Sequence, residues 1–160
     1  MSKRPPIPKP PHKGGCLCGA VRYSFDARPW AVNACHCHDC KKLTGATNLL
    51  MILGPRAAFS HQGETARYRK RADSGNEIDI VRCATCGTRV WHEPLSAPQL
   101  VIFAVGTLDD TSWAVPTSHI FTRSASPGVV FQDDAIVLHD GPTDRAMIFD
   151  AFKRVYGADG

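Results

Sequence analysis

The stretch Cys35-His36-Cys37-His38-Asp39-Cys40 decides how the rest of this 160-residue chain is interpreted. It places three thiols within six residues, among two imidazoles and a carboxylate. Soft ligands this close together favour a metal ion, and zinc suits thiolate-rich tetrahedral sites best. Three cysteines leave one tetrahedral position unassigned. A structural zinc site is closed by four protein ligands and a catalytic one keeps a position open, so the fourth ligand distinguishes the two.

Four further cysteines lie at a distance from this stretch. Cys16 and Cys18 form a glycine-framed Cys-x-Cys, and Cys83 and Cys86 form Cys-x-x-Cys-Gly, the pattern of a zinc knuckle. Two residues apart on an extended segment, side chains point the same way. We therefore expect a structural zinc held by Cys16, Cys18, Cys83 and Cys86, which joins the amino-terminal strand to the middle of the sheet. Since no export signal is evident, metal binding is favoured over disulfides for these seven cysteines.

The net charge of +4 is concentrated at the amino terminus. Residues 1–13 carry four basic side chains, no acidic ones and five prolines, so we predict a disordered, basic, proline-rich tail. The remainder has 15 basic and 15 acidic residues, and we expect no nucleic-acid binding except through the tail. No apolar run approaches a membrane span or a secretory signal. The expected protein is cytoplasmic and makes no membrane contact.

Short alternating or apolar runs predict a mainly β chain. The expected strands are residues 20–25, 48–53, 57–61, 65–70, 77–82, 89–92, 100–105 and 117–122. Residues 142–156 place their apolar side chains on one side of a predicted helix that Gly157 ends. The stretch 35–40 is expected on a loop or knuckle rather than a helix. These elements predict one zinc-binding β domain over residues 14–122, followed by an extension, residues 123–160, that carries the helix.

The three remaining thiols, Cys35, Cys37 and Cys40, leave two alternatives open. In the first, a histidine completes a second structural zinc site. The candidates are His36, His38, His92 and His119. In the second, the fourth position stays open for a ligand. Three thiolates make zinc a weak Lewis acid and favour an exchangeable thiol over activation of water, so the implied substrate is a thiol or a thiol adduct.

Five motifs follow one another along the chain. They are Gly14-Gly15-Cys16-Leu17-Cys18-Gly19, Cys35-His36-Cys37-His38-Asp39-Cys40, Cys83-Ala84-Thr85-Cys86-Gly87, Gly106-Thr107-Leu108-Asp109-Asp110 and Pro116-Thr117-Ser118-His119-Ile120-Phe121. In this order they closely resemble the glutathione-dependent formaldehyde-activating enzyme family, which includes centromere protein V. The resemblance covers about residues 14–122. It implies a β-tent fold with two zinc ions per chain, a structural one on Cys16, Cys18, Cys83 and Cys86 and a second one on Cys35, Cys37 and Cys40.

The founding activity of that family condenses formaldehyde with glutathione to S-hydroxymethylglutathione, and the reverse reaction breaks a carbon-sulfur bond. The resemblance therefore implies a zinc-dependent carbon-sulfur lyase that acts on an adduct of glutathione, or of another small thiol, with a small aldehyde. Cys35, Cys37 and Cys40 are the catalytic residues that it implies. The alternative is a zinc-stabilised binding module without catalysis, whose basic tail contacts a partner. The sequence leaves an oligomer open.

Neighbouring polar residues are candidates for handling protons and charge at such a site. His36, His38 or Asp39 would take the proton of the incoming thiol. Lys41 and Lys42 are candidates for pairing with substrate carboxylates, although lysines on a loop are more often simply solvated. His119 and the pair Asp109-Asp110 are left out of the expected site as acids or bases.

Overall fold

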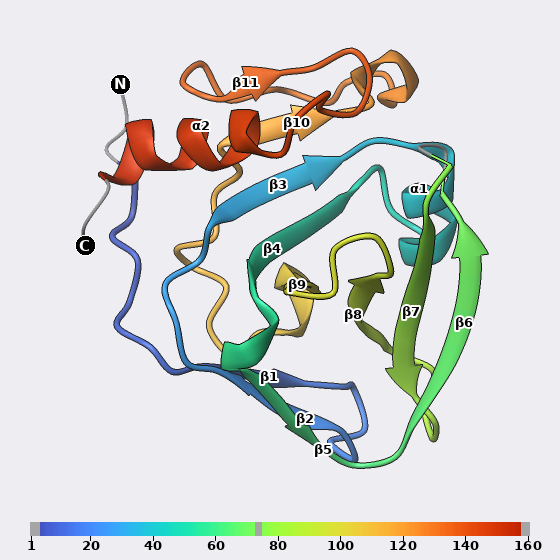
Figure 1. Ribbon diagram of the computed structural model, residues 1–160. Helices are drawn as coiled ribbons and strands as arrows, with labels where there is room; N and C mark the ends of the chain where they lie inside the picture. Colours follow the sequence, from blue (N-terminus) through green and yellow to red (C-terminus); the bar gives the residue numbers. More distant parts are fainter. Residues whose placement is uncertain (1–3, 73–74, 158–160) are drawn as a thin grey trace.

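Strands in two sheets supply more of the described chain than helices do, which confirms the prediction of a mainly β fold with a helix near its carboxyl end. The computed structural model describes residues 4–72 and 75–157, and Figure 1 shows their arrangement. The small sheet has the order β1-β2-β5, and the large sheet has the order β11-β10-β3-β4-β9-β8-β7-β6. The small sheet consists of β1 (His12–Gly15), β2 (Arg22–Phe25) and β5 (Phe59–Gln62). The large sheet consists of β3 (Ala31–Cys35), β4 (Leu49–Pro55), β6 (Thr65–Arg71), β7 (Glu77–Cys83), β8 (Arg89–Pro94), β9 (Leu100–Ala104), β10 (Ser118–Ile120) and β11 (Ile136–Val137).

Helical segments connect and cover these strands. They are α1 (His38–Thr44), α2 (Ala146–Tyr156) and the short 3-10 turns η1 (Arg56–Ala58), η2 (Val105–Thr107) and η3 (Thr122–Ser124). Helix α2 lies against β3 and β10 through the buried side chains of Ile148, Ala151 and Phe152. It begins at Ala146, four residues later than the sequence predicted. No helix in the described part of the chain is long and apolar enough to cross a membrane.

The stretch of closely spaced cysteines is not wholly a loop, so the prediction made for it is wrong in its second half. Helix α1 begins immediately after Cys37, whose sulfur accepts a hydrogen bond from the backbone nitrogen of Cys40 at 3.3 Å. It ends at Gly45, which takes the left-handed conformation (φ 65°) that glycine tolerates best. A helix of seven residues is marginal in isolation, and this one depends on its cap and on tertiary contacts.

The segment before Gly14 is held against the body of the protein. His12 and Lys13 belong to β1 and pair with β2. The guanidinium of Arg4 donates hydrogen bonds to the carboxylate of Asp134 at 2.6 Å and to the carbonyl oxygen of Val115 at 2.9 Å. The prediction of a disordered tail is therefore wrong for Arg4, His12 and Lys13. Arg4 was one of the basic side chains that suggested disorder, but it binds partners more than 100 positions away in sequence. Residues 1–3 lie outside the described part.

One face of the large sheet forms the core. Phe103 lies opposite Ile52 on one neighbouring strand and opposite Trp91 on the other, and all three side chains are fully buried. Phe25 of the small sheet packs on Phe103 with ring centroids 5.0 Å apart, and Phe59 packs on Trp91 at 5.2 Å. Burial of such aromatic side chains supplies much of the free energy that joins two sheets.

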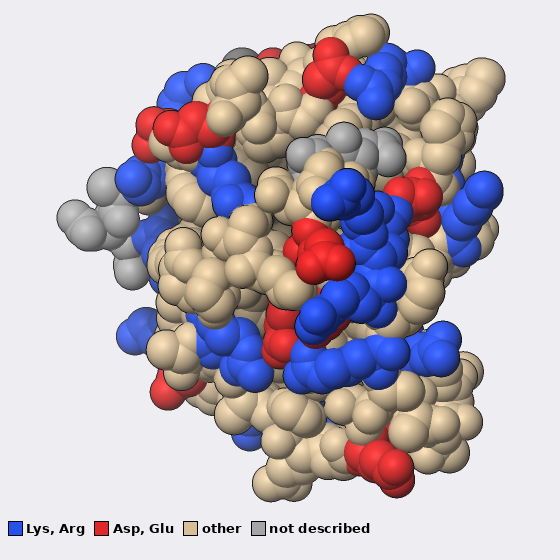
Figure 2. All heavy atoms as spheres, turned by 45° about the vertical axis from the view of Figure 1, so that its right-hand side comes forward, with Lys and Arg blue, Asp and Glu red and all other residues tan. Residues whose placement is uncertain are grey.

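Basic side chains gather over β6, the outer strand of the large sheet, and Figure 2 shows acidic side chains between them. Arg69 donates to Asp79 at 2.8 Å, and Arg67 forms an ion pair with Glu93. Hydrogen bonds from Arg69 lower the pKa of Asp79 from its ordinary value, so this carboxylate stays charged at neutral pH. Charged side chains on an edge strand also discourage pairing with the edge of another molecule.

The close approach of the two sheets predicts that Gly54 of β4 tolerates no side chain. A Cβ atom added there would lie 2.3 Å from Cζ of Phe25, whereas a Cβ at Gly106 would meet no atom within 4 Å. We expect Gly54→Ala to reduce the free energy of unfolding by about 1–3 kcal/mol and Gly106→Ala to change it by less than about 0.5 kcal/mol. Urea denaturation of the two variants measures this. Equal stability of the two variants would contradict the proposed packing of Phe25 on β4.

Candidate metal centres and active site

The four cysteines at positions 16, 18, 83 and 86 come together between β1 and the end of β7, and we call them the four-thiol cluster. Their sulfur atoms all lie within 4.8 Å of one another. The sulfur of Cys18 is 3.5 Å from that of Cys16 and 3.8 Å from that of Cys83. A tetrahedral zinc with bonds of about 2.3 Å separates its sulfur ligands by roughly 3.8 Å. The donor set and its spacing therefore fit a closed tetrahedral metal site.

Cys35, Cys37 and Cys40 form a second group, the three-thiol cluster, where β3 ends and α1 begins. Their sulfur atoms also lie within 4.8 Å of one another, and no histidine or carboxylate among the described residues joins them. His38 is exposed, and His36 is directed toward His119, with 3.0 Å between Nε2 of His36 and Nδ1 of His119. Three thiols that converge in this way fit three of the four positions of a tetrahedral metal ion.

The thiols of this cluster differ in acidity. Hydrogen bonds from Cys35, and then from Cys40, lower the pKa of Cys37 to about 2. The same contacts with its neighbours, together with burial, raise the pKa of Cys35 above its ordinary value. Cys37 is therefore the thiol that ionises first, and a thiolate is the form of cysteine that binds a metal.

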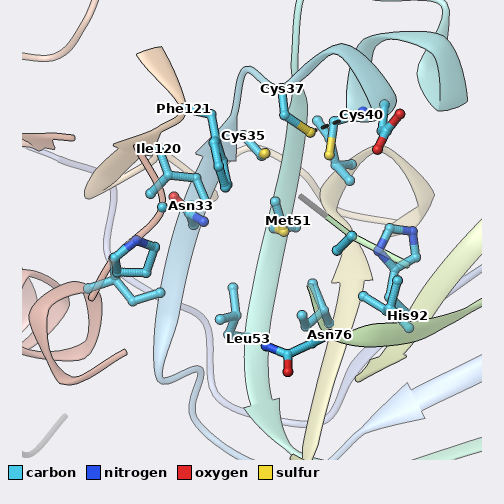
Figure 3. Close-up of a pocket in the computed structure, with 18 of the residues that line it drawn as sticks. Asn33, Cys35, Cys37, Cys40, Met51, Leu53, Asn76, His92, Ile120 and Phe121 are labelled. Carbon is cyan, nitrogen blue, oxygen red and sulfur yellow. Dashed lines mark hydrogen bonds between the residues drawn. The ribbon is translucent and has the colours of Figure 1, made fainter. Parts of the chain in front are cut away.

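The three-thiol cluster opens into a cavity of about 580 Å³ on the face of the large sheet that is opposite to the core (Figure 3). Leu49, Met51 and Leu53, which alternate along β4, line it together with residues opposite them on neighbouring strands. Cys35 lies opposite Leu49, and Ile102 lies opposite Leu53. A pocket of this size accommodates a small organic molecule.

A few polar side chains line this cavity near the thiols, among them Asn33, whose side-chain oxygen accepts a hydrogen bond from Ser118 at 3.0 Å. Asp39 lines it and forms an ion pair with Lys70, which lines it as well. His92 also lines it, with its Nε2 atom 3.2 Å from a guanidinium nitrogen of Arg89. Burial, aided by the charge of Arg89, lowers the pKa of His92 to about 3, so its imidazole is neutral at neutral pH.

The structure separates the polar residues that the sequence marked as candidates. Asp39 faces the cavity, whereas His36 is fully buried in a chain of contacts with His119 and Gln132, in which Nε2 of His119 lies 2.7 Å from the side-chain oxygen of Gln132. Lys41 donates to the backbone oxygen of Ser124 at 2.7 Å, and Lys42 is exposed. Neither lysine lines the cavity, so the expectation that they hold substrate carboxylates gains no support from this geometry.

Sequence reasoning missed part of the cavity. It named His92 only as a distant metal ligand, although the position of His92 opposite Ile80 and Ile102 puts all three on one face of the sheet. It also gave no role to residues 141–145, which line the cavity together with Ile148 of α2. The alternation of side chains along the strand could have placed His92 on the cavity face. No local sequence pattern shows that residues 141–145, which follow β11, lie against this cavity.

Comparisons with known proteins agree with the cysteine arrangement. Residues 11–124, which include all seven cysteines, match the model of a family described as glutathione-dependent formaldehyde-activating enzyme. The fold is similar to that of a Rhodobacter sphaeroides protein whose crystal structure was determined in structural genomics, with a TM-score of 0.50 and 18% identity over 79% of this chain and 98% of that chain. This identity supports the fold alone. A search of curated proteins gave no match.

The two clusters predict two metal ions per chain, which native mass spectrometry and elemental analysis can count. Cys83→Ser should remove one ion and lower the melting temperature, because the four-thiol cluster joins segments 65 residues apart and metal binding there adds to folding free energy. Cys37→Ser should remove the other ion. His38→Ala is the control and should keep both ions. Two ions in either cysteine variant would contradict the assignment of ligands.

Proposed function

The chain belongs to the glutathione-dependent formaldehyde-activating enzyme family, and from this premise we propose that it is a zinc-dependent carbon-sulfur lyase. In this proposal it forms and cleaves the adduct of a small thiol, such as glutathione, with an aldehyde. The observation that carries the proposal is that the three-thiol cluster opens into a cavity without a fourth ligand among the described side chains. That geometry suits an exchangeable ligand better than a closed structural site.

We assign zinc to both clusters and different roles to the two ions. We assign the structural role to the four-thiol cluster, because its four thiols can fill all four positions of a tetrahedral ion. When bound in the three-thiol cluster, zinc would supply a position where a thiol substrate is held and more readily loses its proton. Cys35, Cys37 and Cys40 are the residues that would hold it, and their direction into the cavity aims the substrate sulfur at the space above β4.

The proposed reaction needs no oxidant and no reductant. When the adduct forms, an electron pair of the thiolate sulfur makes the carbon-sulfur bond, and the π electrons of the carbonyl group move to its oxygen. That oxygen then takes up the proton that the thiol released. Cleavage follows the same steps in reverse and returns thiol and aldehyde.

Two cavity residues have roles in moving and holding this proton. We assign Asp39 as the group that accepts the thiol proton and returns it to the oxygen, because its carboxylate lines the cavity next to the thiols. Arg89 is a donor toward Nε2 of His92, which places the ring proton of this neutral imidazole on Nδ1. His92 is therefore suited to donate a hydrogen bond to the carbonyl oxygen as negative charge develops there.

The proposal predicts that the protein accelerates the exchange between free formaldehyde and its glutathione adduct, as measured by exchange NMR. Cys40→Ala should abolish the acceleration, and Asp39→Asn should lower kcat by about 10²- to 10⁴-fold through loss of the proton acceptor. Lys42→Ala, an exposed change outside the cavity, should leave the rate unchanged.

Retained activity in Cys40→Ala would exclude the three-thiol cluster from the reaction. A wild-type protein that carries two zinc ions and accelerates the exchange of neither formaldehyde nor a larger aldehyde such as hexanal would exclude the lyase and favour a binding module without catalysis. Ion counts and melting temperatures of each variant separate loss of chemistry from loss of structure.

A further inference from the structure

Beyond the thiols, the floor of the cavity is mostly apolar, and its polar members are Asn33, opposite Met51, and Asn76. Met51 and Leu53 extend it along β4 away from Cys35, and Figure 3 shows their side chains below the thiols. Ile102 of β9 and Ile80 of β7 continue the floor sideways, because they lie on the same sheet face as Leu53 and His92. A thiol adduct of formaldehyde has a single carbon on the far side of its sulfur, which leaves this floor without an apolar partner.

The wall of the cavity comes from a part of the chain outside the family match. Residues 141–145 and Ile148 line it, whereas the match ends at residue 124. Ile148 is 2% exposed and belongs to the core, since α2 packs on β3 and β10. Ile148 and Pro142 therefore add apolar surface to the wall beyond the matched segment, whereas Thr143, Asp144 and Arg145 are exposed at its edge.

Charged groups at this cavity are confined to two places. Asp39 and Lys70 form one ion pair, and Asp144 and Arg145 are exposed residues just before α2. The charged ends of a peptide thiol such as glutathione lose free energy when they leave water without charged partners. Those ends therefore belong at the exposed edge of the cavity, and the substituent on the other side of the sulfur belongs on the apolar floor.

We propose that the aldehyde substrate carries an apolar aliphatic or aromatic group that lies on the floor formed by Met51, Leu53 and Ile102. This inference rests on the proposed lyase function and names its substrate class. Transfer of each methylene group from water to an apolar surface tightens binding about threefold to fourfold. A chain of several carbons therefore gives a clear preference over formaldehyde.

Calorimetric titration of the zinc-loaded protein with S-methylglutathione and S-hexylglutathione tests the binding preference without any reaction. We expect the hexyl thioether to bind at least about tenfold more tightly than the methyl one. Ile102→Ser, which makes the floor polar, should reduce this ratio to about threefold or less. Ile136→Ser is the matched control: it changes a partly buried isoleucine of β11 outside the cavity and should keep the ratio.

Equal affinity of the two thioethers for the wild-type protein, or no binding of either, would overturn the inference. This comparison needs no variant, so poor folding of Ile102→Ser would not prevent the decision.

Exchange NMR with glutathione and either formaldehyde or hexanal separates this inference from the proposed function. We expect kcat/KM for hexanal to exceed that for formaldehyde by at least about tenfold. Acceleration with formaldehyde but not with hexanal would overturn the inference and leave the proposed lyase intact. Acceleration with neither would contradict the lyase itself, and the inference would fail with it.

Discussion

Successive side chains of a β-strand point to opposite faces, and this alternation determines which side chains of the large sheet form the core and which line the cavity. On β4, Ile52 faces the core beside Phe103 of β9, while its neighbours Met51 and Leu53 face the cavity. Residues that pair across neighbouring strands share a face, so the core-facing side chains form one row across the sheet and the cavity-facing side chains form another. The first row is the aromatic core, and the second is the mostly apolar floor of the cavity. Since a register shift of one residue would exchange the two faces, the pairing that stabilises the fold also positions the cavity.

The thiols occupy one end of this arrangement for a related reason. Cys35 is the last residue of β3 and lies on the cavity face opposite Leu49, whereas Cys37 and Cys40 approach from the start of α1. Helix α1 is short, and the hydrogen bond from the backbone of Cys40 to the sulfur of Cys37 ties its first turn to the cluster. In the proposed holoprotein, metal binding and helix formation would therefore stabilise each other.

Cysteine spacing, strand alternation and helical periodicity carried most of what the sequence could predict. They placed the four-thiol cluster, the mainly β fold and the carboxyl-terminal helix, because each depends on local patterns of two to four residues. They missed α1, whose cap is a cysteine rather than the usual serine, threonine or aspartate. They also missed the attachment of Arg4, since its partner Asp134 lies 130 residues away and no local pattern marks such a contact. The apolar floor was visible only in part, as the apolar run 48–53 that was predicted to be a strand.

The cavity is lined by two parts of the chain, one inside the segment that matches the family and one beyond it. The thiols belong to the segment that matches the family, and the wall before and within α2 lies beyond it. Under the proposed function, sulfur chemistry and the choice of carbonyl compound would then depend on separate elements, because the sulfur position is fixed by β3 and α1 while the volume beside it is limited by the α2 segment. A change in that wall alters the space offered to the aldehyde and leaves the cysteine ligands in place. A thiol site inside the matched segment beside a wall outside it would explain how one fold accepts different adducts of the same thiol.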